Sequence, residues 1–317
     1  MRHIFIINPK AGKRDQTARI YGMADRLRDV HGLDCECLLT TRPGGAMDMA
    51  RKLAETGEVL RIYACGGDGT VSEVANGIAG FSNAAMTCVP AGTGNDFLKN
   101  FGPDMPRFAD AENLWDGAVF PLDLIDCSGR LCVTIACCGL DAQVAESVHR
   151  FSGTPLLSGR GSYLCSVAAN FLFRPLGHHW TVSLDGEAQE GSFVLAAMCN
   201  GRYYGGGSTP VPQARMDDGV LHTILIREVR RLDFARLFGT YSAGAYEKLP
   251  PSLFQVSQAR EIRIAGEEAF TVCLDGECLR TREAVLRLSD KRVNFFGPKG
   301  CDPNATARRM PAAAGVE

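Results

Sequence analysis

The sequence predicts an α/β fold: an N-terminal α/β nucleotide-binding domain with a mostly parallel sheet, followed by a C-terminal antiparallel β-sandwich domain. Short apolar runs alternate with amphipathic stretches over the first 121 residues, which is typical of helices layered on a parallel sheet. From residue 122 onward, strand-like segments dominate and Asp-Gly turns join them. The 317-residue chain is also long for one core. We therefore expect domains over 1–121 and 122–291, with segment 292–317 completing the first.

Four apolar runs in the first domain predict buried parallel strands. They cover Ile4–Asn8, Cys35–Thr40, Val59–Cys65 and Met86–Val89. Apolar residues at helical spacing between these runs predict three helices, around 20–27, over Ala46–Glu55 and around 71–78. Ligands of such sheets bind at the carboxyl ends of strands. Glycine-bearing turns follow the first, third and fourth strands, so we expect the site at that edge of the sheet.

The second half is predicted to be mainly strands. Period-two alternation and short apolar runs place them at Leu122–Cys127, Leu131–Cys138, Trp180–Leu184, Phe193–Cys199, Leu221–Ile226, Glu261–Ala265, Phe270–Leu274 and Ala284–Leu288. Two helical insertions are expected, about Ser162–Phe173 and about Arg231–Tyr246. The Pro- and Ala-rich tail from Cys301 is expected to be frayed.

Composition excludes several classes of protein. A net charge of −2 argues against a nucleic-acid binder held by bulk positive charge. No run of about 20 apolar residues predicts a membrane span, and the apolar stretch at the N-terminus is too short for a signal peptide. The 13 cysteines are odd in number and form no CxxC pair, which favours free thiols in a reducing compartment. We expect a cytoplasmic protein.

The turn Gly66-Gly67-Asp68-Gly69-Thr70 follows the third predicted strand and has residue types that can hold polyphosphate. Backbone amides approach a phosphate closely only where side chains are absent, and the next helix adds partial positive charge at its N-terminus. Asp68 would repel phosphate unless a metal intervenes, which favours Mg²⁺. The alternative is an ordinary strand-to-helix turn in which Asp68 is a cap.

Two further turns lie at strand ends. In Gly92-Thr93-Gly94-Asn95-Asp96 the Thr93 hydroxyl can donate to phosphate, whereas Asn95 or Asp96 can cap the following helix. The turn Asn8-Pro9-Lys10-Ala11-Gly12 is by itself a Pro/Gly turn, and its phosphate role depends on its neighbours. None of the three turns is a GxxxxGK[ST] loop.

Together these motifs resemble the catalytic domain of bacterial soluble diacylglycerol kinases and related lipid kinases, which sphingosine and ceramide kinases share. The order and spacing of Asn8–Gly12, Gly66–Glu73 and Gly92–Phe97 match the family. The resemblance continues through Tyr204–Gly207, Pro212–Leu221 and Asp275-Gly276-Glu277, and it covers the chain to about Pro298. It departs from the family at Lys99, where an arginine is common.

The resemblance implies ATP as phosphoryl donor, Mg²⁺ as cofactor, and Glu277 as general base, with Asp68 as the second catalytic residue. ATP would contact Asn8, Pro9, Lys10, Ala11, Gly12, Thr40, Gly66, Gly67, Asp68, Gly69, Thr70, Val71, Ser72, Glu73 and Thr93. Mg²⁺ would be held by Asp218 and by the backbone carbonyls of Arg215 and Val220. Asp68, Asp96 and Asp123 would join it through water, with Asn95 in the supporting network.

Chemistry supports Glu277 independently, because phosphoryl transfer to an alcohol needs a carboxylate that takes the hydroxyl proton. Taken alone, Glu277 fits a solvent-exposed hairpin residue better, and the motif context reverses that preference. The same tripeptide occurs at Asp185-Gly186-Glu187, which we interpret as a plain hairpin.

The sequence therefore predicts an ATP- and Mg²⁺-dependent lipid kinase that phosphorylates a hydroxyl of a diacylglycerol-like lipid and visits the membrane surface transiently. An NAD kinase-like phosphotransferase shares the GGDGT loop and is the nearest alternative. A non-catalytic nucleotide-binding regulator is the alternative from another class. A homodimer stays open.

Overall fold

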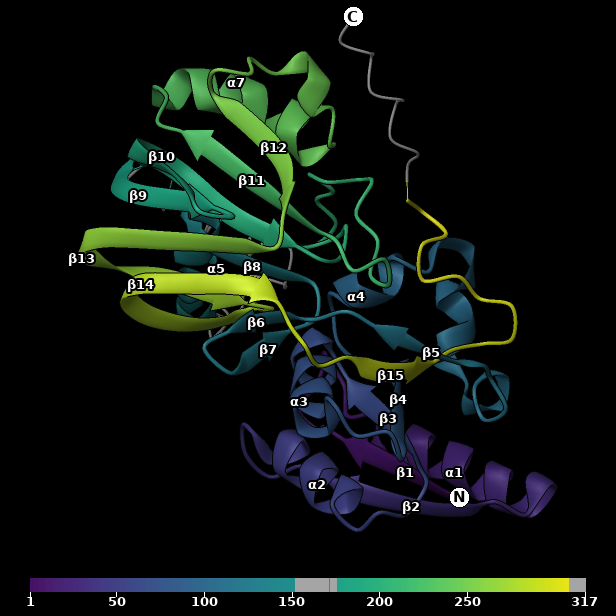
Figure 1. Ribbon diagram of the computed structural model, residues 1–317. Helices are drawn as coiled ribbons and strands as arrows, with labels where there is room; N and C mark the ends of the chain where they lie inside the picture. The colour runs from purple at the N-terminus through teal and green to yellow at the C-terminus, as the bar shows by residue number, and fades with distance from the viewer. Residues whose placement is uncertain (152–170, 172–175, 308–317) are drawn as a thin grey trace, which may run out of the picture.

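The computed structural model describes residues 1–151, 171 and 176–307, with residues 148–151 described by their backbone alone. Two layered domains lie one above the other in Figure 1, and the chain crosses between them near β5 and β15. The N-terminal α/β domain has a mostly parallel sheet, and the C-terminal domain is antiparallel and β-rich, so the predicted fold class is confirmed.

The N-terminal sheet has six strands in the order β2-β1-β3-β4-β15-β5. They are β1 (Arg2–Ile7), β2 (Asp34–Leu39), β3 (Leu60–Gly66), β4 (Ala84–Pro90), β5 (Val119–Leu122) and β15 (Val293–Phe296). All neighbouring pairs are parallel except β15 with β5. Ile4 to Ile7 are at most 1% exposed, because helices cover both faces of a parallel sheet.

Helices complete this layer. They are α1 (Thr17–His31), α2 (Gly45–Ala54), α3 (Asp68–Ile78) and the short α4 (Asp96–Lys99), followed by the 3₁₀ segments η1 (Gly102–Ala109) and η2 (Ala111–Asn113). Helices α2 and α3 pack closely: an added Cβ at Gly77 would lie 2.7 Å from the Met47 carbonyl oxygen. That contact holds α2 beside the strand ends that carry the glycine turns.

Among the described residues, nine strands form the C-terminal sheet, and every neighbouring pair is antiparallel. They are β6 (Ile125–Cys127), β7 (Arg130–Cys132), β8 (Ile135–Gly139), β9 (His178–Leu184), β10 (Glu187–Cys199), β11 (Leu221–Arg227), β12 (Phe254–Ala259), β13 (Glu261–Leu274) and β14 (Glu277–Leu288). Strands β10 and β13 each pair with β9 over one half and with β8 over the other, so the sheet folds onto itself. Trp180 and Phe270 fill the interior, with ring centroids 5.1 Å apart.

In the part of the chain that the structure describes, this sheet is accompanied by α5 (Leu140–Phe151), α7 (Arg231–Ser242) and η3 (Tyr246–Lys248). Helix α7 begins at Arg231, as the second predicted insertion does, and ends at Ser242, four residues before the predicted end at Tyr246. The first predicted insertion, Ser162–Phe173, lies outside the described residues apart from Phe171, which stacks against Phe234 of α7. Sequence patterns missed α5 and the largely polar edge strand β12, since period-two alternation is weak at a sheet edge.

Two predicted strands are each split in the structure. Leu122–Cys127 divides at Asp123, so that β5 and β6 belong to different sheets. Asp123 is 1% exposed, and its carboxylate accepts the Gly219 amide at 2.6 Å and pairs with Arg292 at 2.7 Å. Leu131–Cys138 divides at Val133-Thr134. The backbone amides there donate to the Asp275 carboxylate instead of continuing a ladder.

The expectation of a tail frayed from Cys301 is wrong for the part that is described. Arg202 is 2% exposed and donates to the backbone oxygens of Asn100 and Pro303, each at 2.8 Å, and to the Thr306 hydroxyl at 3.0 Å. It also donates to the Ala214 carbonyl. Burial lowers the pKa of Arg202 to about 10. Because a buried guanidinium needs several acceptors, it fixes the segment after β15 against both domains.

Two expectations from the sequence, one about membrane spans and one about the cysteines, can be compared with the described residues. Within them, no helix is both long and apolar enough to cross a bilayer. The 12 cysteines that fall in the described part of the chain are all free thiols.

Candidate active site

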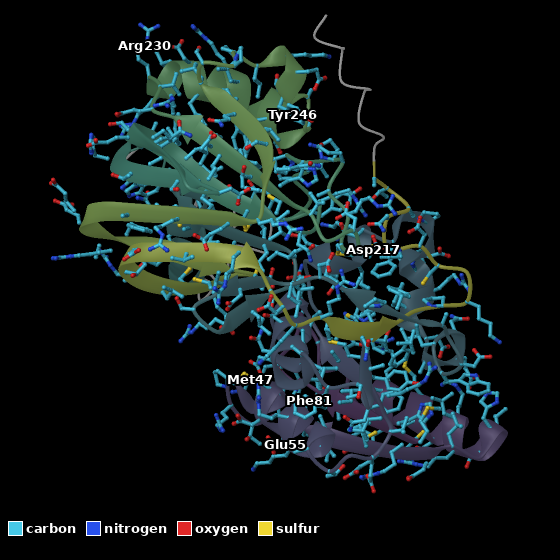
Figure 2. The ribbon with its side chains drawn as sticks, in the orientation of Figure 1. Met47, Glu55, Phe81, Asp217, Arg230 and Tyr246 are labelled. Carbon is cyan, nitrogen blue, oxygen red and sulfur yellow. The ribbon has the colours of Figure 1, made fainter. Side chains whose placement is uncertain are left out.

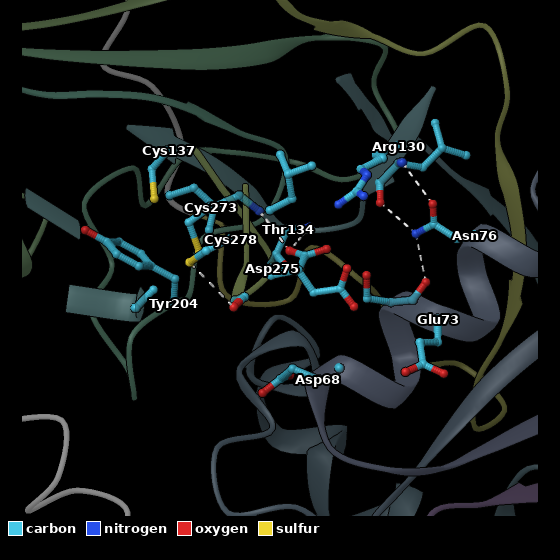
Figure 3. A pocket seen from close by; sticks show the side chains of 18 of the residues that line it. Asp68, Glu73, Asn76, Arg130, Thr134, Cys137, Tyr204, Cys273, Asp275 and Cys278 are labelled. Atoms are coloured by element: carbon cyan, nitrogen blue, oxygen red, sulfur yellow. Dashed lines mark hydrogen bonds between the residues drawn. The ribbon is translucent and has the colours of Figure 1, made fainter. Parts of the chain in front are cut away.

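A cavity of about 1050 Å³ lies between the two domains. The N-terminal domain contributes residues of α2, α3 and Asp96. The C-terminal domain contributes β8, the start of α5, the turn at 203–205 and the hairpin that joins β13 to β14. Figure 3 shows Asp68 on one wall and Asp275 facing it from the other domain, with Glu73 and Asn76 at one end and Tyr204 at the opposite end. The cavity is therefore a space that only the folded pair of domains creates.

The three glycine-bearing turns pack backbone against backbone at the strand ends. An added Cβ at Gly92 would lie 2.6 Å from the Gly67 Cα, and one at Gly12 would lie 2.1 Å from the Ala91 oxygen. Gly12 also has a φ of 77°, in the left-handed region that side chains disfavour. The Asn8 amide donates to the Thr70 hydroxyl at 3.4 Å. Their glycines are thus needed for the turns to touch, whatever they bind.

Asp68 joins the second turn to the third. Its two carboxylate oxygens accept the backbone amides of Asp96 and Phe97 at 3.1 and 3.0 Å, at the start of α4. Loss of solvation raises the pKa of Asp68, and the neighbouring Asp96 carboxylate adds to the rise. Asp96 itself accepts the Gly206 amide at 2.8 Å and pairs with Lys99, so the substituted lysine keeps an ion pair in place.

Glu73 lies in the cavity but is already bound by protein groups. Its two oxygens accept the backbone amides of Gly44 and Ala46, both at 2.9 Å. This carboxylate caps the N-terminus of α2, where the partial positive charge of the helix favours it. Thr40, at the end of β2, donates its amide to Ile7 at 2.8 Å and lies against this turn.

Hydrogen bonds to the entry of β8 hold the hairpin that carries Glu277 in place. Asp275 and Gly276 have φ values of 47° and 97°, a type I′ turn between the paired residues Leu274 and Glu277. The Asp275 carboxylate accepts the amides of Val133, Thr134 and Ile135 at 2.5, 2.9 and 3.2 Å. The turn is thereby locked onto the entry to β8, and the exposed Glu277 side chain lines the cavity.

The twin hairpin has the same turn in a different place. Asp185 and Gly186 have φ values of 46° and 95°, and Asp185 accepts the amides of Arg260 and Glu261. Glu187 is exposed and is absent from the residues that line the cavity. The tertiary position, rather than the tripeptide, separates the two glutamates.

A second acidic group lies at the domain junction, outside the cavity; Figure 2 labels Asp217 there. The exposed Asp218 accepts the Val220 amide at 3.1 Å, and its loop is tied to Asp123 through Gly219. Partial burial and the charges of Asp123 and Asp217 raise the pKa of Asp218. Such a carboxylate, among other oxygen donors, fits a largely hydrated Mg²⁺. Within the described residues no cluster of three metal-ligating side chains occurs.

The predicted residues thus fall into three groups. Those that line the cavity are Asp68, Gly69, Ser72, Glu73, Asp96 and Glu277. Those on the packed turns or beside them, outside the cavity lining, are Asn8, Pro9, Lys10, Ala11, Gly12, Thr40, Gly66, Gly67, Thr70, Val71, Thr93 and Asn95. Those at the junction are Asp123, Arg215, Asp218 and Val220. The structure joins Asp68 to Asp96 and Asp123 to the Asp218 loop, through separate hydrogen bonds.

Sequence reasoning missed several residues that line the cavity. Three cations, Arg51, Arg130 and Lys291, reach it from different elements. Asp141, at the start of α5, also lines it and accepts the Tyr204 hydroxyl. None of these lies in the three glycine turns at the strand ends; Arg130 follows the Ser128-Gly129 turn between β6 and β7. The one sequence signal was the polar Asp141 directly after the buried run of β8.

Comparisons with known proteins match both domains of the chain. Residues 2–127 match the family described as "Diacylglycerol kinase catalytic domain", and residues 134–295 match the "YegS C-terminal NAD kinase beta sandwich-like domain". A Pseudomonas aeruginosa protein named "Probable lipid kinase YegS-like" is 31% identical over 247 residues, which cover 75% of this chain and 77% of that protein. The chain belongs to the YegS-like lipid kinase family. The predicted family resemblance is thereby confirmed.

Further relatives of this YegS-like kinase support the assignment along most of its length. A Stenotrophomonas maltophilia protein with the same name is 30% identical over 296 residues, 87% of this chain and 93% of that protein. A crystal structure from Bacillus anthracis, named provisionally as a diacylglycerol kinase, superposes with a TM-score of 0.73. It is 24% identical and covers 93% of this chain and 96% of its own, so it supports the fold alone.

Proposed function

We propose that this YegS-like kinase transfers the γ-phosphoryl group of ATP, in the presence of Mg²⁺, to a hydroxyl of a diacylglycerol-like lipid at a membrane surface. The observation that carries the proposal is the shared cavity. Asp68, from the glycine turn, and Glu277, from the other domain, line the same space. Phosphoryl transfer depends mostly on holding two substrates in line, and a cavity between two domains supplies that arrangement.

At the nucleotide end, the chain offers backbone amides and cations. The three packed glycine turns keep side chains away from the strand ends, so phosphate oxygens can approach the amides there. Arg51, Arg130 and Lys291 line the cavity and would neutralise the charge of the transferred group. Asp68 positions α4 through its two amide hydrogen bonds.

At the acceptor end, Glu277 is the group that would take the hydroxyl proton. Its carboxylate is exposed to the cavity, and Asp275 holds its hairpin in place through three amide hydrogen bonds. Ile135, Ala145 and Leu274 give the same cavity an apolar wall, which suits acyl chains.

The residues that would hold Mg²⁺ are Asp218 and the backbone carbonyls of Arg215 and Val220. The metal would supply positive charge that offsets the crowded carboxylates beside Asp218. Asp123 supports that loop by accepting the Gly219 amide.

The activity test uses γ-labelled ATP with Mg²⁺ and offers dioleoylglycerol in detergent micelles and NAD in parallel reactions. We expect label in the lipid. Label in NAD alone would establish the NAD kinase-like alternative. ATP binding without label in any acceptor would favour the nucleotide-binding regulator.

The variant test uses the duplicated tripeptide as its own control. Glu277→Gln is expected to lower kcat about 10²- to 10⁴-fold, the usual worth of a general base, with little change in KM for ATP. Glu187→Gln makes the same chemical change in the twin hairpin and is expected to stay within about twofold of wild type. Equal activity of the two variants would remove Glu277 from the mechanism.

A further inference from the structure

Asn76, in the last turn of α3, joins the two domains through its side chain. Its amide nitrogen donates to the Leu131 carbonyl at 2.7 Å, and its oxygen accepts the Leu131 backbone amide at 2.9 Å. Leu131 belongs to β7, which ends the described strand order of the C-terminal sheet. The same nitrogen also donates to the Ser72 carbonyl, one turn earlier in α3, at 2.9 Å. Figure 3 shows Asn76 near Glu73, at one end of the cavity.

The Asn76 side chain takes the place of a neighbouring strand beside β7. The two-residue turn Ser128-Gly129 makes Asp126 and Leu131 a pair without mutual hydrogen bonds, so the Leu131 amide and carbonyl point to the open edge of the hairpin. These two groups need one acceptor and one donor. A carboxamide offers both on one rigid plane, which a carboxylate does not. The bridge is thus a short piece of sheet-like pairing between the domains.

Strand β7 leads directly into the segment that holds the Glu277 hairpin. Leu131 and Val133 both pack in the hydrophobic cluster of the N-terminal domain. The Val133 amide donates to the Asp275 carboxylate at 2.5 Å, and Asp275 lies in the turn that leads into Glu277. A continuous path of hydrogen bonds and backbone therefore connects Asn76 to the proposed base.

The same helix carries the nucleotide side of the cavity. Helix α3 begins at Asp68, and roughly two helical turns, or about 12 Å, separate Asp68 from Asn76. Asp68 and Asp275 face each other across the cavity in Figure 3. The Asn76 bridge therefore ties the wall that carries Glu277 to the helix that carries Asp68.

We infer that Asn76 is a positioning residue for the phosphoryl transfer: its bridge to β7 holds the Glu277 hairpin opposite the Asp68 turn. Both hydrogens of its NH₂ group are used within the protein, so it acts through Leu131 and Asp275 rather than on the reacting atoms. This inference rests on the proposed function and adds to it the contact that sets the base relative to the nucleotide.

The test variant is Asn76→Ser. A serine hydroxyl can still bond the Ser72 carbonyl within its own helix, but it is one bond too short to reach β7. We expect kcat with dioleoylglycerol to fall about 10- to 100-fold, because a misplacement of about 1 Å can cost 10²-fold in rate. The dissociation constant for Mg²⁺-ATP should stay within about twofold, since Asp68 keeps its hydrogen bonds to Asp96 and Phe97.

Asn83→Ala is the matched control. The Asn83 side chain also donates to two carbonyls, those of Ala54 and Glu58, both at 2.9 Å, but all three residues lie in the N-terminal domain. Its loss removes a comparable pair of hydrogen bonds without touching the junction between the domains. We expect kcat within about twofold of wild type.

A double mutant separates positioning from a general structural defect. If Asn76 acts through the base, Asn76→Ser combined with Glu277→Gln should have a kcat within about threefold of Glu277→Gln alone. A purely structural defect would instead multiply the two losses. Hydrogen exchange adds a measurement that needs no turnover: in Asn76→Ser the Leu131 amide should exchange at least about tenfold faster, because its acceptor is gone.

Several outcomes contradict the inference. Wild-type kcat in Asn76→Ser would overturn it, as would multiplied losses in the double mutant or a more than tenfold weaker affinity for Mg²⁺-ATP. Unchanged exchange of the Leu131 amide would overturn it too. In each of these cases the wild-type protein still phosphorylates lipid, and the proposed function survives. Absence of label in every lipid with the wild-type protein would instead refute the proposed function, and this inference with it.

Discussion

The hairpin under Glu277 allows a prediction that separates local turn chemistry from tertiary positioning. Asn is as well suited as Asp to the first position of a type I′ turn, so Asp275→Asn leaves the turn itself intact. It changes only the hydrogen bonds that the side chain accepts from the backbone amides of Val133, Thr134 and Ile135. One Asp275 oxygen accepts Thr134 and Ile135 at 2.9 and 3.2 Å, and the other accepts Val133 at 2.5 Å. An asparagine side chain can still offer one oxygen to the Thr134 and Ile135 amides. Its NH₂ group, which is a donor, then faces the Val133 amide, which is also a donor.

The expected loss in the free energy of unfolding follows from the hydrogen bonds that change. One charge-assisted hydrogen bond is lost, two become neutral, and two donors are brought together at a half-buried site. At about 1.5–3 kcal/mol for a hydrogen bond to a charged group, we expect a loss of about 2–4 kcal/mol in the free energy of unfolding. We also expect kcat to fall about tenfold or more, because the hairpin no longer holds Glu277 at the cavity.

Asp185→Asn is the matched control. One oxygen of the exposed Asp185 accepts the amides of Arg260 and Glu261, at 2.9 and 2.8 Å, and the other accepts only the Arg260 amide again, at 3.2 Å. An asparagine oxygen can therefore keep both amides satisfied. Its cost should be below about 1 kcal/mol with unchanged kcat. Urea denaturation followed by circular dichroism, with steady-state kinetics on the same samples, measures both quantities. Equal stability and equal kcat for the two variants would refute the reasoning.

Three further predictions follow from the packing. Arg202→Met should cost about 3–5 kcal/mol in thermal unfolding, since it leaves several buried carbonyls without donors; a change under 1 kcal/mol would contradict this. Because the folded pKa of Asp141 is about 6, above its ordinary 3.8, stability should fall as pH rises from about 4 to 6, and Asp141→Asn should flatten that slope in pH-dependent denaturation. Gly92→Ala should raise KM for ATP more than tenfold, because its Cβ would lie 2.6 Å from the Gly67 Cα. The control Gly22→Ala, where nothing lies within 4 Å, should leave KM unchanged.

Much of the N-terminal domain could be predicted because its signals are local. Buried parallel strands are continuous apolar runs, and the turns after β1, β3 and β4 contain the glycines that close backbone packing needs. The strands of the C-terminal domain were harder to delimit. The breaks at Asp123 and at Val133 depend on partners far along the chain, namely Arg292 and Asp275. No local pattern reports such partners.

The residues of the candidate site also divide into those that local motifs predict and those that they do not. Asp68 and Glu277 were identified from motifs, but Arg130, Lys291 and Asp141 were not, because they lie outside those motifs and only the tertiary structure brings them to the cavity. Arg202 was missed for a related reason. Its structural role depends on buried carbonyls of two segments, one 102 residues before it and one 101 residues after it in the sequence.

By itself, the sequence determined the fold class, the glycine turns at the strand ends and the lipid kinase family, since each rests on residue types at short, fixed spacing. The tertiary structure decided which of two identical Asp-Gly-Glu hairpins lines the cavity, and it placed Asp141 beside that hairpin. The physical reason is that both hairpins satisfy the same local turn geometry. The pairing of β13 with β8 and the long-range hydrogen bonds of Asp275 to the entry of β8 hold one of them opposite Asp68.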